Sequence, residues 1–424
     1  MLRILHTADW HLGQTFFGYD RTKEHLHFFK WLSSEIEKRE IDVLLISGDV
    51  FDVSNPSSAS QRMFYQFLSN ALSNNVNLQI VIIAGNHDSA SRLEAPQPLL
   101  DEERVVIKGL ISKMHNDDID YESLIVNLRN KKGEVEALCL AVPFLRQGDY
   151  PTRSNGKSNS YSEGVQAFYV EILEKAKQLK TENQALIAMG HLHTINAVHA
   201  EKDHSERIVI GGLERISPDV FTDDLAYTAL GHIHKAQRVN KRENIRYAGT
   251  PLPMSFSEID YTHGVVEVVI NNGKLQSIDK HTYEPLVQLI RIPPLRVGAL
   301  SPAELLNELQ ALPSIHKDSC FDHYPFLEIN VLLTEPEPLL KNKIEEIVSH
   351  KAVRLASIRS HFKNDKADDD KQLTGELKGL EEKAPIDVAK SYYKKLYNVD
   401  IPRDLQELFL EVNLLIETKK EEEK

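Results

Sequence analysis

The sequence of 424 residues has very little cysteine and no long apolar run. Its two cysteines, Cys139 and Cys320, lie far apart and outside any metal-ligand spacing, which excludes a disulfide framework and fits a reducing compartment. No apolar stretch approaches the ~20 residues of a membrane-spanning helix, and the first residues show neither the charged region nor the cleavage site of a signal peptide. We therefore expect a cytoplasmic protein with no membrane partner.

Positive charge is also scarce, since 50 lysines and arginines face 63 aspartates and glutamates, for a net charge of −13. Affinity for nucleic-acid phosphates comes largely from lysine and arginine, so strong unaided binding to nucleic acid is not expected. A nucleic acid would have to be held by local basic groups or by a partner. Five basic residues are candidates for such contacts, although ordinary surface salt bridges explain each of them alone better: Arg21, Lys23, Arg62, Arg92 and Arg146.

Five short apolar runs predict buried strands: Leu2–Leu5, Val43–Ile46, Ile80–Ile83, Leu186–Met189 and Ala226–Leu230. Strands buried on both faces belong to parallel or mixed sheets covered by helices, and ligands gather at the carboxyl ends of such strands. Polar residues suited to metal binding stand at these ends: Asp9 and His11, Asp49, Asn86 with His87, His191, and His232 with His234. Glycines precede four of these clusters and permit close approach of the backbone to an ion or a phosphate: Gly48, Gly85, Gly190 and Gly231.

The chemistry of these donors restricts the ligand. Carboxylate, imidazole and carboxamide groups without thiolate suit manganese, iron, zinc or magnesium, and a histidine-rich set favours Mn²⁺ or Fe²⁺. Two metals roughly 3.5–4 Å apart can clamp a phosphate and activate a water, which requires a bridging carboxylate, and Asp49 is the best candidate. His87 follows Asn86 and would project differently, so we expect it to donate a proton or a hydrogen bond to the reacting phosphate.

Each residue also has a structural interpretation. A single aspartate or asparagine after a strand is more often a helix cap, but five such clusters in one order favour a common site. His193 competes with His191 as a ligand, and the glycine before His191 favours the latter. We expect His6 to be a hydrogen-bonded core residue, and Trp10 to pack beneath the site rather than to stack on a base.

The motifs follow a recognisable order: D-W-H-L-G from Asp9, G-D-V-F-D from Gly48, G-N-H-D from Gly85, G-H from Gly190 and G-H-I-H from Gly231. This order resembles the calcineurin-like metallophosphoesterase superfamily. Within it, three stretches resemble the nuclease subunits of bacterial SbcCD complexes: RILHTADWHLGQ from Arg3, ALGHIH from Ala229 and RYAGTPLPMSFSE from Arg246. The resemblance covers roughly the first two-thirds of the chain.

The resemblance implies an α/β fold, a four-layer sandwich of two mixed sheets flanked by helices. It also implies two Mn²⁺ ions, with Mg²⁺ or Fe²⁺ as alternatives, and a catalytic role for His87. One metal would be held by Asp9, His11, Asp49 and His234, and the other by Asp49, Asn86, His191 and His232. Asp52 ends the second motif, where some relatives have histidine, and we give it no ligand role.

The implied activity is that of a DNA nuclease, a double-strand 3′–5′ exonuclease and a single-strand and hairpin endonuclease in DNA end processing, recombination and repair. Its implied partners are DNA, an SbcC-type coiled-coil ATPase and a second copy of the chain within a heterotetramer. The dimer would use the amphipathic helix expected over Ser57–Asn75 and the segment after His87. Two alternatives stay open, a phosphodiesterase or phosphoprotein phosphatase acting on a non-DNA substrate, and a non-catalytic scaffold.

The length of the chain predicts two or three domains. We expect a phosphoesterase domain over 1–285, a small α+β capping domain over 286–360, a linker over 361–383 and a helical segment over 384–424 that binds the ATPase or docks back on this chain. The linker is charged and poor in large apolar groups. Further expected elements are a loop over Thr152–Ser162, strands over Val265–Ile270, Leu286–Ile292 and Phe326–Leu333, and helices over Pro302–Leu312 and Pro338–His350.

Overall fold

A computed structural model describes residues 1–101, 103–151, 160–197, 215–316, 320–335 and 337–362, together with residues 390, 393, 402, 405 and 406. The chain divides into two units, Met1–His361 and Phe362–Lys424, and the account below concerns the first. The predicted linker and helical segment lie almost entirely outside the described residues. Within the described part of the chain, no helix combines the length and apolarity needed to cross a membrane.

The first sheet has the strand order β14-β13-β1-β4-β5-β6. Its strands are β1 (Leu2–Thr7), β4 (Val43–Ser47), β5 (Gln79–Ile83), β6 (Val105–Lys108), β13 (Gly264–Asn271) and β14 (Lys274–Thr282). The strands β1, β4, β5 and β6 run parallel to one another, whereas β13 and β14 are antiparallel to their neighbours. Every residue of β4 and β5 is buried, as expected for strands covered on both faces.

The second sheet has the order β11-β12-β10-β9-β8-β7. Its strands are β7 (Ile125–Arg129), β8 (Val135–Ala141), β9 (Ala185–His191), β10 (Leu225–Gly231), β11 (Gln237–Val239) and β12 (Arg242–Tyr247). Its parallel centre consists of β8, β9, β10 and β12, with β7 and β11 antiparallel at the edges. All five strands predicted to carry the site are therefore present, and no end differs from its predicted position by more than two residues.

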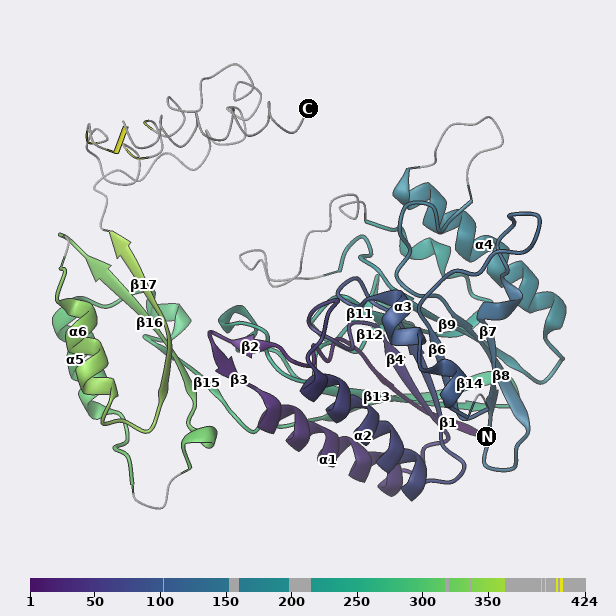
Figure 1. Ribbon diagram of the computed structural model, residues 1–424, viewed down its shortest axis with the longest axis horizontal. Helices are drawn as coiled ribbons and strands as arrows, with labels where there is room; N and C mark the ends of the chain where they lie inside the picture. Colours follow the sequence, from purple (N-terminus) through teal and green to yellow (C-terminus); the bar gives the residue numbers. More distant parts are fainter. Residues whose placement is uncertain are drawn as a thin grey trace. The chain divides into compact units, whose positions relative to one another are not determined.

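The two sheets face each other, and helices cover their outer faces (Figure 1). In β4 the side chains alternate, so that Val43 and Leu45 fill the layer between the sheets while Leu44 and Ile46 meet the helices. The helices α1 (Thr22–Lys38) and α2 (Ser58–Asn74) pack on the first sheet, and α4 (Tyr161–Leu179) packs on the second. This arrangement confirms the four-layer sandwich. The predicted helix at Ser57–Asn75 is α2, with Ser57 as its N-cap.

Helix α4 begins earlier than the sequence suggested. Residues 161 and 162, predicted to end a loop, form its first turn, because Ser160 and Glu163 make a capping box that stabilises a helix start. The rest of that predicted loop, residues 152–159, lies outside the described residues. Short elements complete this part of the chain: β2 (Thr15–Phe16), β3 (Tyr19–Asp20), α3 (Ala90–Glu94), and the 3₁₀ turns η1 (Gln97–Leu99), η2 (Glu122–Leu124), η3 (Pro218–Val220) and η4 (Phe256–Glu258).

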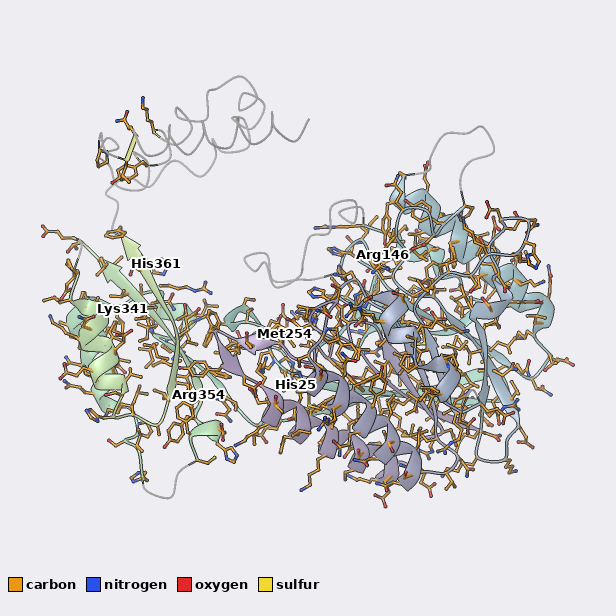
Figure 2. All side chains as sticks on the ribbon, viewed as in Figure 1. His25, Arg146, Met254, Lys341, Arg354 and His361 are labelled. Carbon is orange, nitrogen blue, oxygen red and sulfur yellow. The ribbon has the colours of Figure 1, made fainter. Side chains whose placement is uncertain are left out.

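A third sheet, of order β15-β16-β17, has a hydrophobic core of its own. Its elements are β15 (Leu289–Ile292), η5 (Leu295–Val297), α5 (Pro302–Ala311), η6 (Phe321–His323), β16 (Phe326–Leu333), α6 (Leu340–Val348) and β17 (Arg354–Phe362). The strand predicted from Leu286 begins only at Leu289. An aromatic cluster joins this sheet to the sandwich, because Phe326 contacts Phe16 and the Arg354 guanidinium lies 3.9 Å from the Phe326 ring centroid (Figure 2).

Candidate metal centre

The segments that follow β1, β4, β5, β9 and β10 come together where the two sheets meet. Backbone hydrogen bonds join the first two of these segments, since the amide of Asp9 donates to Gly48 O and that of His11 to Asp49 O, both at 3.0 Å. Asp9, His11, Asp49 and His232 all have positive φ, between 47° and 98°. Non-glycine residues rarely adopt this strained conformation, and its concentration in one place marks a functional site.

Asp49 lies at the centre of the site. Its Oδ2 atom is 3.3 Å from Nε2 of His191 and 3.8 Å from Nε2 of His11. Two atoms that each lie about 2.0–2.2 Å from a shared ion are at most about 4.4 Å apart. Both separations meet this limit, so one carboxylate reaches a histidine from each sheet, as a bridging ligand must. The other oxygen, Oδ1, accepts the backbone N–H of His87 at 2.8 Å.

Asn86 joins two histidines of the second sheet to this centre. Its Oδ1 atom lies 2.9 Å from Nε2 of His191 and 2.9 Å from Nδ1 of His232. Nδ1 of His191 donates to the carbonyl of Ser47 at 2.9 Å, which leaves Nε2 facing the oxygens of Asn86 and Asp49. A neutral His191 would thus direct a lone pair at two acceptors, an arrangement that a cation between them satisfies.

The remaining candidates lie beside Asp49 on the side of the first sheet. Oδ1 of Asp9 accepts the backbone N–H of His232 at 2.9 Å, and ligand atoms of Asp9, His11 and Asp49 lie within 4.8 Å of one another. The rings of His11 and His234 are 5.3 Å apart. Oδ2 of Asp9 and Nε2 of His11 are buried and have no hydrogen-bond partner among the described residues, so a bound cation suits both.

Glycine makes the close approach of these segments possible. A Cβ atom on Gly85 would lie 2.1 Å from Asp49 Oδ1, and one on Gly48 would lie 2.3 Å from Nδ1 of His191. A Cβ atom on Gly231 would lie 1.9 Å from the Ser47 carbonyl oxygen. These distances are far below van der Waals contact, so a side chain at any of the three positions would displace a ligand candidate or its hydrogen-bond acceptor.

The electrostatics also favour positive charge at the centre. Burial lowers the pKa of His191, but the Asp49 and Asp9 carboxylates and the Ser47 carbonyl together outweigh burial and raise that pKa to about 9. Burial raises the pKa of Asp49, but its neighbours His191, His11 and His87 together outweigh burial and hold that pKa far below its ordinary value. Burial also raises the pKa of Asp9 to about 7 and lowers the pKa values of His11 and His232. In the metal-free protein a proton on His191 thus supplies the positive charge that a metal would replace.

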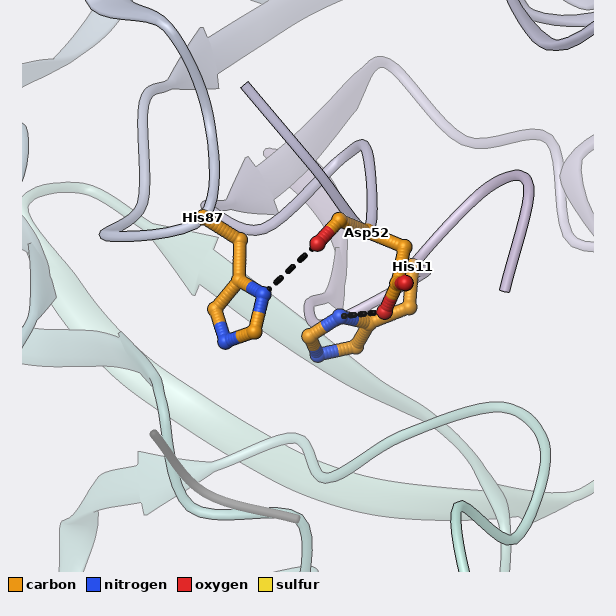
Figure 3. Close-up of side chains that lie close together, drawn as sticks. All are labelled: His11, Asp52 and His87. Carbon is orange, nitrogen blue, oxygen red and sulfur yellow. Dashed lines mark hydrogen bonds and ion pairs between the residues drawn. The ribbon is translucent and has the colours of Figure 1, made fainter. Parts of the chain in front are cut away.

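His87 lies at the edge of the centre and is only 8% exposed. Its Nδ1 donates to the Asp52 carbonyl at 2.8 Å, so Nε2 is the ring nitrogen that this bond does not use (Figure 3). The Asp52 carboxylate lies 3.3 Å from Nδ1 of His11 (Figure 3). Asp52 therefore contacts both histidines, a role that the sequence analysis did not assign.

Two further supporting residues were missed. Glu258, buried at the end of η4, accepts a hydrogen bond at 2.8 Å from Nδ1 of His234, which turns Nε2 of that ring toward the site. Asp88 accepts the backbone N–H groups of Val50 and Gly85 and so ties together the loops after β4 and β5. Burial raises the pKa of Asp88 to about 6. In the sequence, the only indication that these two residues belong to the site was their position, because Glu258 ends the RYAGTPLPMSFSE motif and Asp88 ends the G-N-H-D motif.

Several neighbouring residues have the structural roles expected of them. His6 is buried and its Nδ1 hydrogen-bonds the Tyr227 hydroxyl at 2.9 Å. Trp10 is fully buried among phenylalanines and donates to Thr7 Oγ1, so it packs beneath the site. The ring of His193 lies 6.1 Å from that of His232, whereas His191 is in direct contact with Asn86 and Asp49.

Comparisons with known proteins identify the family of the chain. A family model described as calcineurin-like phosphoesterase matches residues 2–236, more than half of the chain, and a second, described as type 5 capsule protein repressor C-terminal domain, matches residues 285–397. The fold and the site define a metallophosphoesterase that binds divalent metal ions.

Curated relatives narrow this class. The chain is 35% identical over 362 residues to a protein of Rhodobacter capsulatus named as the SbcD subunit of the nuclease SbcCD, and the match covers 84% of this chain and 87% of the relative. Proteins of the same name from Escherichia coli and Bacillus subtilis are each 32% identical, over 66% and 64% of this chain and 67% of each relative. The chain belongs to the family of SbcD nuclease subunits, within the calcineurin-like phosphoesterases.

Proposed function

We propose that the chain is the catalytic subunit of a cytoplasmic, ATP-dependent SbcCD-type complex and cleaves DNA with divalent metals. The proposed activities are 3′–5′ exonuclease on double strands and endonuclease on single strands and hairpins, in DNA end processing, recombination and repair. The relatives are named as subunits of the nuclease SbcCD, which supports a nucleic-acid substrate and an SbcCD-type complex. The observation that carries the enzymatic part is the Asp49 carboxylate, which lies between His11 and His191.

We propose two Mn²⁺ ions at this centre, with Mg²⁺ or Fe²⁺ as alternatives. The proposed ligands are Asp9, His11, Asp49 and His234 for one ion, and Asp49, Asn86, His191 and His232 for the other. When bound, such a pair supplies the Lewis acidity that activates water and stabilises charge on the phosphate. The chain's own part is to present one bridging carboxylate and histidines whose proton positions are already fixed by Ser47 and Glu258.

His87 is the proposed general acid. With Nδ1 donating to the Asp52 carbonyl, Nε2 can carry the proton that a leaving oxygen requires, or donate a hydrogen bond to the phosphate. The backbone N–H of His87 is held by Asp49 Oδ1, so the residue is anchored to the metal centre through its main chain while its ring stays available to the substrate. In this proposal Asp49 binds metal, and His87 acts as the acid without binding metal.

The remaining parts of the chain have proposed roles in assembly. We propose a nuclease domain over 1–285, a capping domain over 286–360 that restricts access of DNA, a linker over 361–383 and a partner-binding segment over 384–424. The third sheet supports the second of these, because it has its own core. The partner is an SbcC-type coiled-coil ATPase, and α2 with the segment after His87 forms a homodimer within a heterotetramer.

A His87→Asn variant of the full chain tests the proposed function. Cleavage of end-labelled duplex and hairpin DNA in manganese, with and without the coiled-coil ATPase, should fall about 10²–10⁴-fold while the metal content measured by mass spectrometry stays near that of wild type. His281→Asn, on β14 and hydrogen-bonded to Glu267, is the matched control and should cleave normally. Loss of metal from the His87 variant would show that His87 is a ligand. A wild-type chain that hydrolyses small phosphodiesters but no DNA would refute the proposed substrate.

A further inference from the structure

Arg146 is an exposed cation whose guanidinium is little used by the protein itself. Three of the other basic candidates are engaged: Arg21 is buried and paired with Glu24, Lys23 pairs with Asp322, and Arg92 donates to Asn55. The Arg146 guanidinium makes one long hydrogen bond, from Nη2 to the Asp88 carbonyl at 3.4 Å, and no ion pair with a carboxylate among the described residues.

The Arg146 side chain lies close to the metal centre. Arg146 is labelled in Figure 2. Its Cζ atom lies 5.5 Å from the ring centroid of Phe144, and that ring lies 6.3 Å from the ring of His191. The backbone N–H of Phe144 donates to Ala84 O at 2.8 Å, which ties the loop after β8 to the segment that carries the G-N-H-D motif. The bond to Asp88 therefore places the guanidinium beside the residue that follows His87.

The loop itself is held by its backbone rather than by the guanidinium. The Arg146 amide donates to Asp149 Oδ2 at 2.7 Å, and the Asp149 amide donates to the Arg146 carbonyl at 3.0 Å. The nearby carboxylate is thus used to close a turn. A planar guanidinium with five N–H donors, stacked on an aromatic ring and facing solvent, is well suited to bind a phosphate through two hydrogen bonds.

We propose that Arg146 binds a DNA phosphate neighbouring the one that is cleaved, and so positions the strand across the metal centre. This inference rests on the proposed function. The chain carries a net charge of −13, so DNA must be held by cations placed locally or by a partner, and Arg146 is such a local cation at the edge of the site. Because it lies outside the ligand set, it contributes to binding of a polynucleotide and not to hydrolysis of a substrate with a single phosphodiester.

The test compares Arg146→Ala and Arg146→Lys with Arg129→Ala in the full chain with manganese. Arg129 is a matched control, because its guanidinium also donates to one backbone carbonyl, Gly133 O at 3.2 Å, and it pairs with Val135 at the start of β8, the end of the sheet opposite the site. Arg146→Ala should weaken DNA affinity about 10-fold and lower the slope of log K against log salt by about 1. Arg146→Lys should retain part of the affinity, and Arg129→Ala should retain all of it.

Hydrolysis of bis(4-nitrophenyl) phosphate, which has one phosphodiester, provides the second measurement. Arg146→Ala should hydrolyse it at the wild-type rate, with unchanged metal content. An equal loss of activity on this compound and on DNA would overturn the inference, since Arg146 would then act through the metal centre. Unchanged DNA affinity and salt dependence would overturn it too. A wild-type chain that hydrolyses the small compound but neither binds nor cleaves DNA would overturn the proposed function as well, an outcome distinct from the first two.

Discussion

Replacing Glu258 should weaken one metal site and leave the other nearly intact. Glu258 is only 2% exposed, and both of its carboxylate oxygens are used. Oε1 accepts from Nδ1 of His234 and Oε2 accepts from the Met254 amide, each at 2.8 Å. The first bond fixes which ring nitrogen of His234 carries the proton, and the second fixes the carboxylate. Among the proposed ligands, only His234 is bonded to this carboxylate in the described structure.

The expected size of the effect follows from these two bonds. Loss of a partner that orients a metal-bound histidine typically lowers metal affinity about 10–100-fold, or about 1.4–2.7 kcal/mol. Glu258→Gln keeps the shape but offers one acceptor oxygen to two donors, so we expect about 10-fold. Glu258→Ala removes both acceptors and leaves the buried Met254 amide unpaired, so we expect about 100-fold, with a further loss of about 1–3 kcal/mol in stability.

Calorimetric titration of manganese into the metal-free full chain checks this prediction. Wild type should bind two ions, and Glu258→Gln should bind one as wild type does and one more weakly. Glu243→Gln is a suitable control, because Glu243 is exposed and pairs with Arg238 at the surface. Unchanged affinity for both ions in Glu258→Gln would refute the reasoning, as would an equal loss at both sites accompanied by a large fall in melting temperature.

Two further substitutions test the close packing at Gly85 and the burial of the Asp9 carboxyl group. Gly85→Ala should lower the metal content to below one ion per chain, because its Cβ would lie 2.1 Å from Asp49 Oδ1. Gly133→Ala, with no atom within 4 Å of its Cβ, is the control and should keep its metal. A normal metal content in Gly85→Ala would contradict the prediction. Burial raises the pKa of Asp9 from 3.8 to about 7, so folding favours the protonated form of this carboxyl group. Protonated Asp9 therefore stabilises the folded, metal-free chain fully below about pH 4, and this stabilisation is lost as the pH rises through 7. Asp9→Asn should therefore raise the melting temperature of the chelator-treated protein at pH 8 but not at pH 4, and a lower melting temperature at both values would show the burial argument to be wrong.

The strands that carry the site could be predicted because each apolar run that forms a buried strand is followed within a few residues by polar candidates for metal binding. A run such as Val43–Ile46 is apolar enough to lie between two layers, and β4 does so. The glycine that follows it allows the chain to turn, and the next residue, Asp49, reaches the centre. When strands are parallel, their carboxyl ends share an edge, so the order of the motifs predicts that distant residues meet. His191 was preferred to His193 for another reason, the glycine that precedes it.

Residues that support the ligands could not be found in this way. Glu258 follows His234 by 24 positions, with β11 and β12 between them, and no periodicity relates the two residues. Asp52 was given no ligand role, and it acts on His87 through its carbonyl, which every residue has and no motif reveals. The start of α4 was hidden for a different reason, because its capping serine, Ser160, ends a run of serine and asparagine that is typical of loops.

The support of His234 also connects the site to the third sheet. Glu258 ends η4, and Phe256 begins it. Phe256 packs against Phe16 in the aromatic cluster that contains Phe326 of β16, and its carbonyl accepts a hydrogen bond at 2.9 Å from Arg291 of β15. Three residues of chain therefore contact the third sheet at one end and orient a proposed metal ligand at the other. The geometry of the metal centre depends on packing well outside the motifs, which explains why the motifs identify the ligands but do not by themselves determine how they are held.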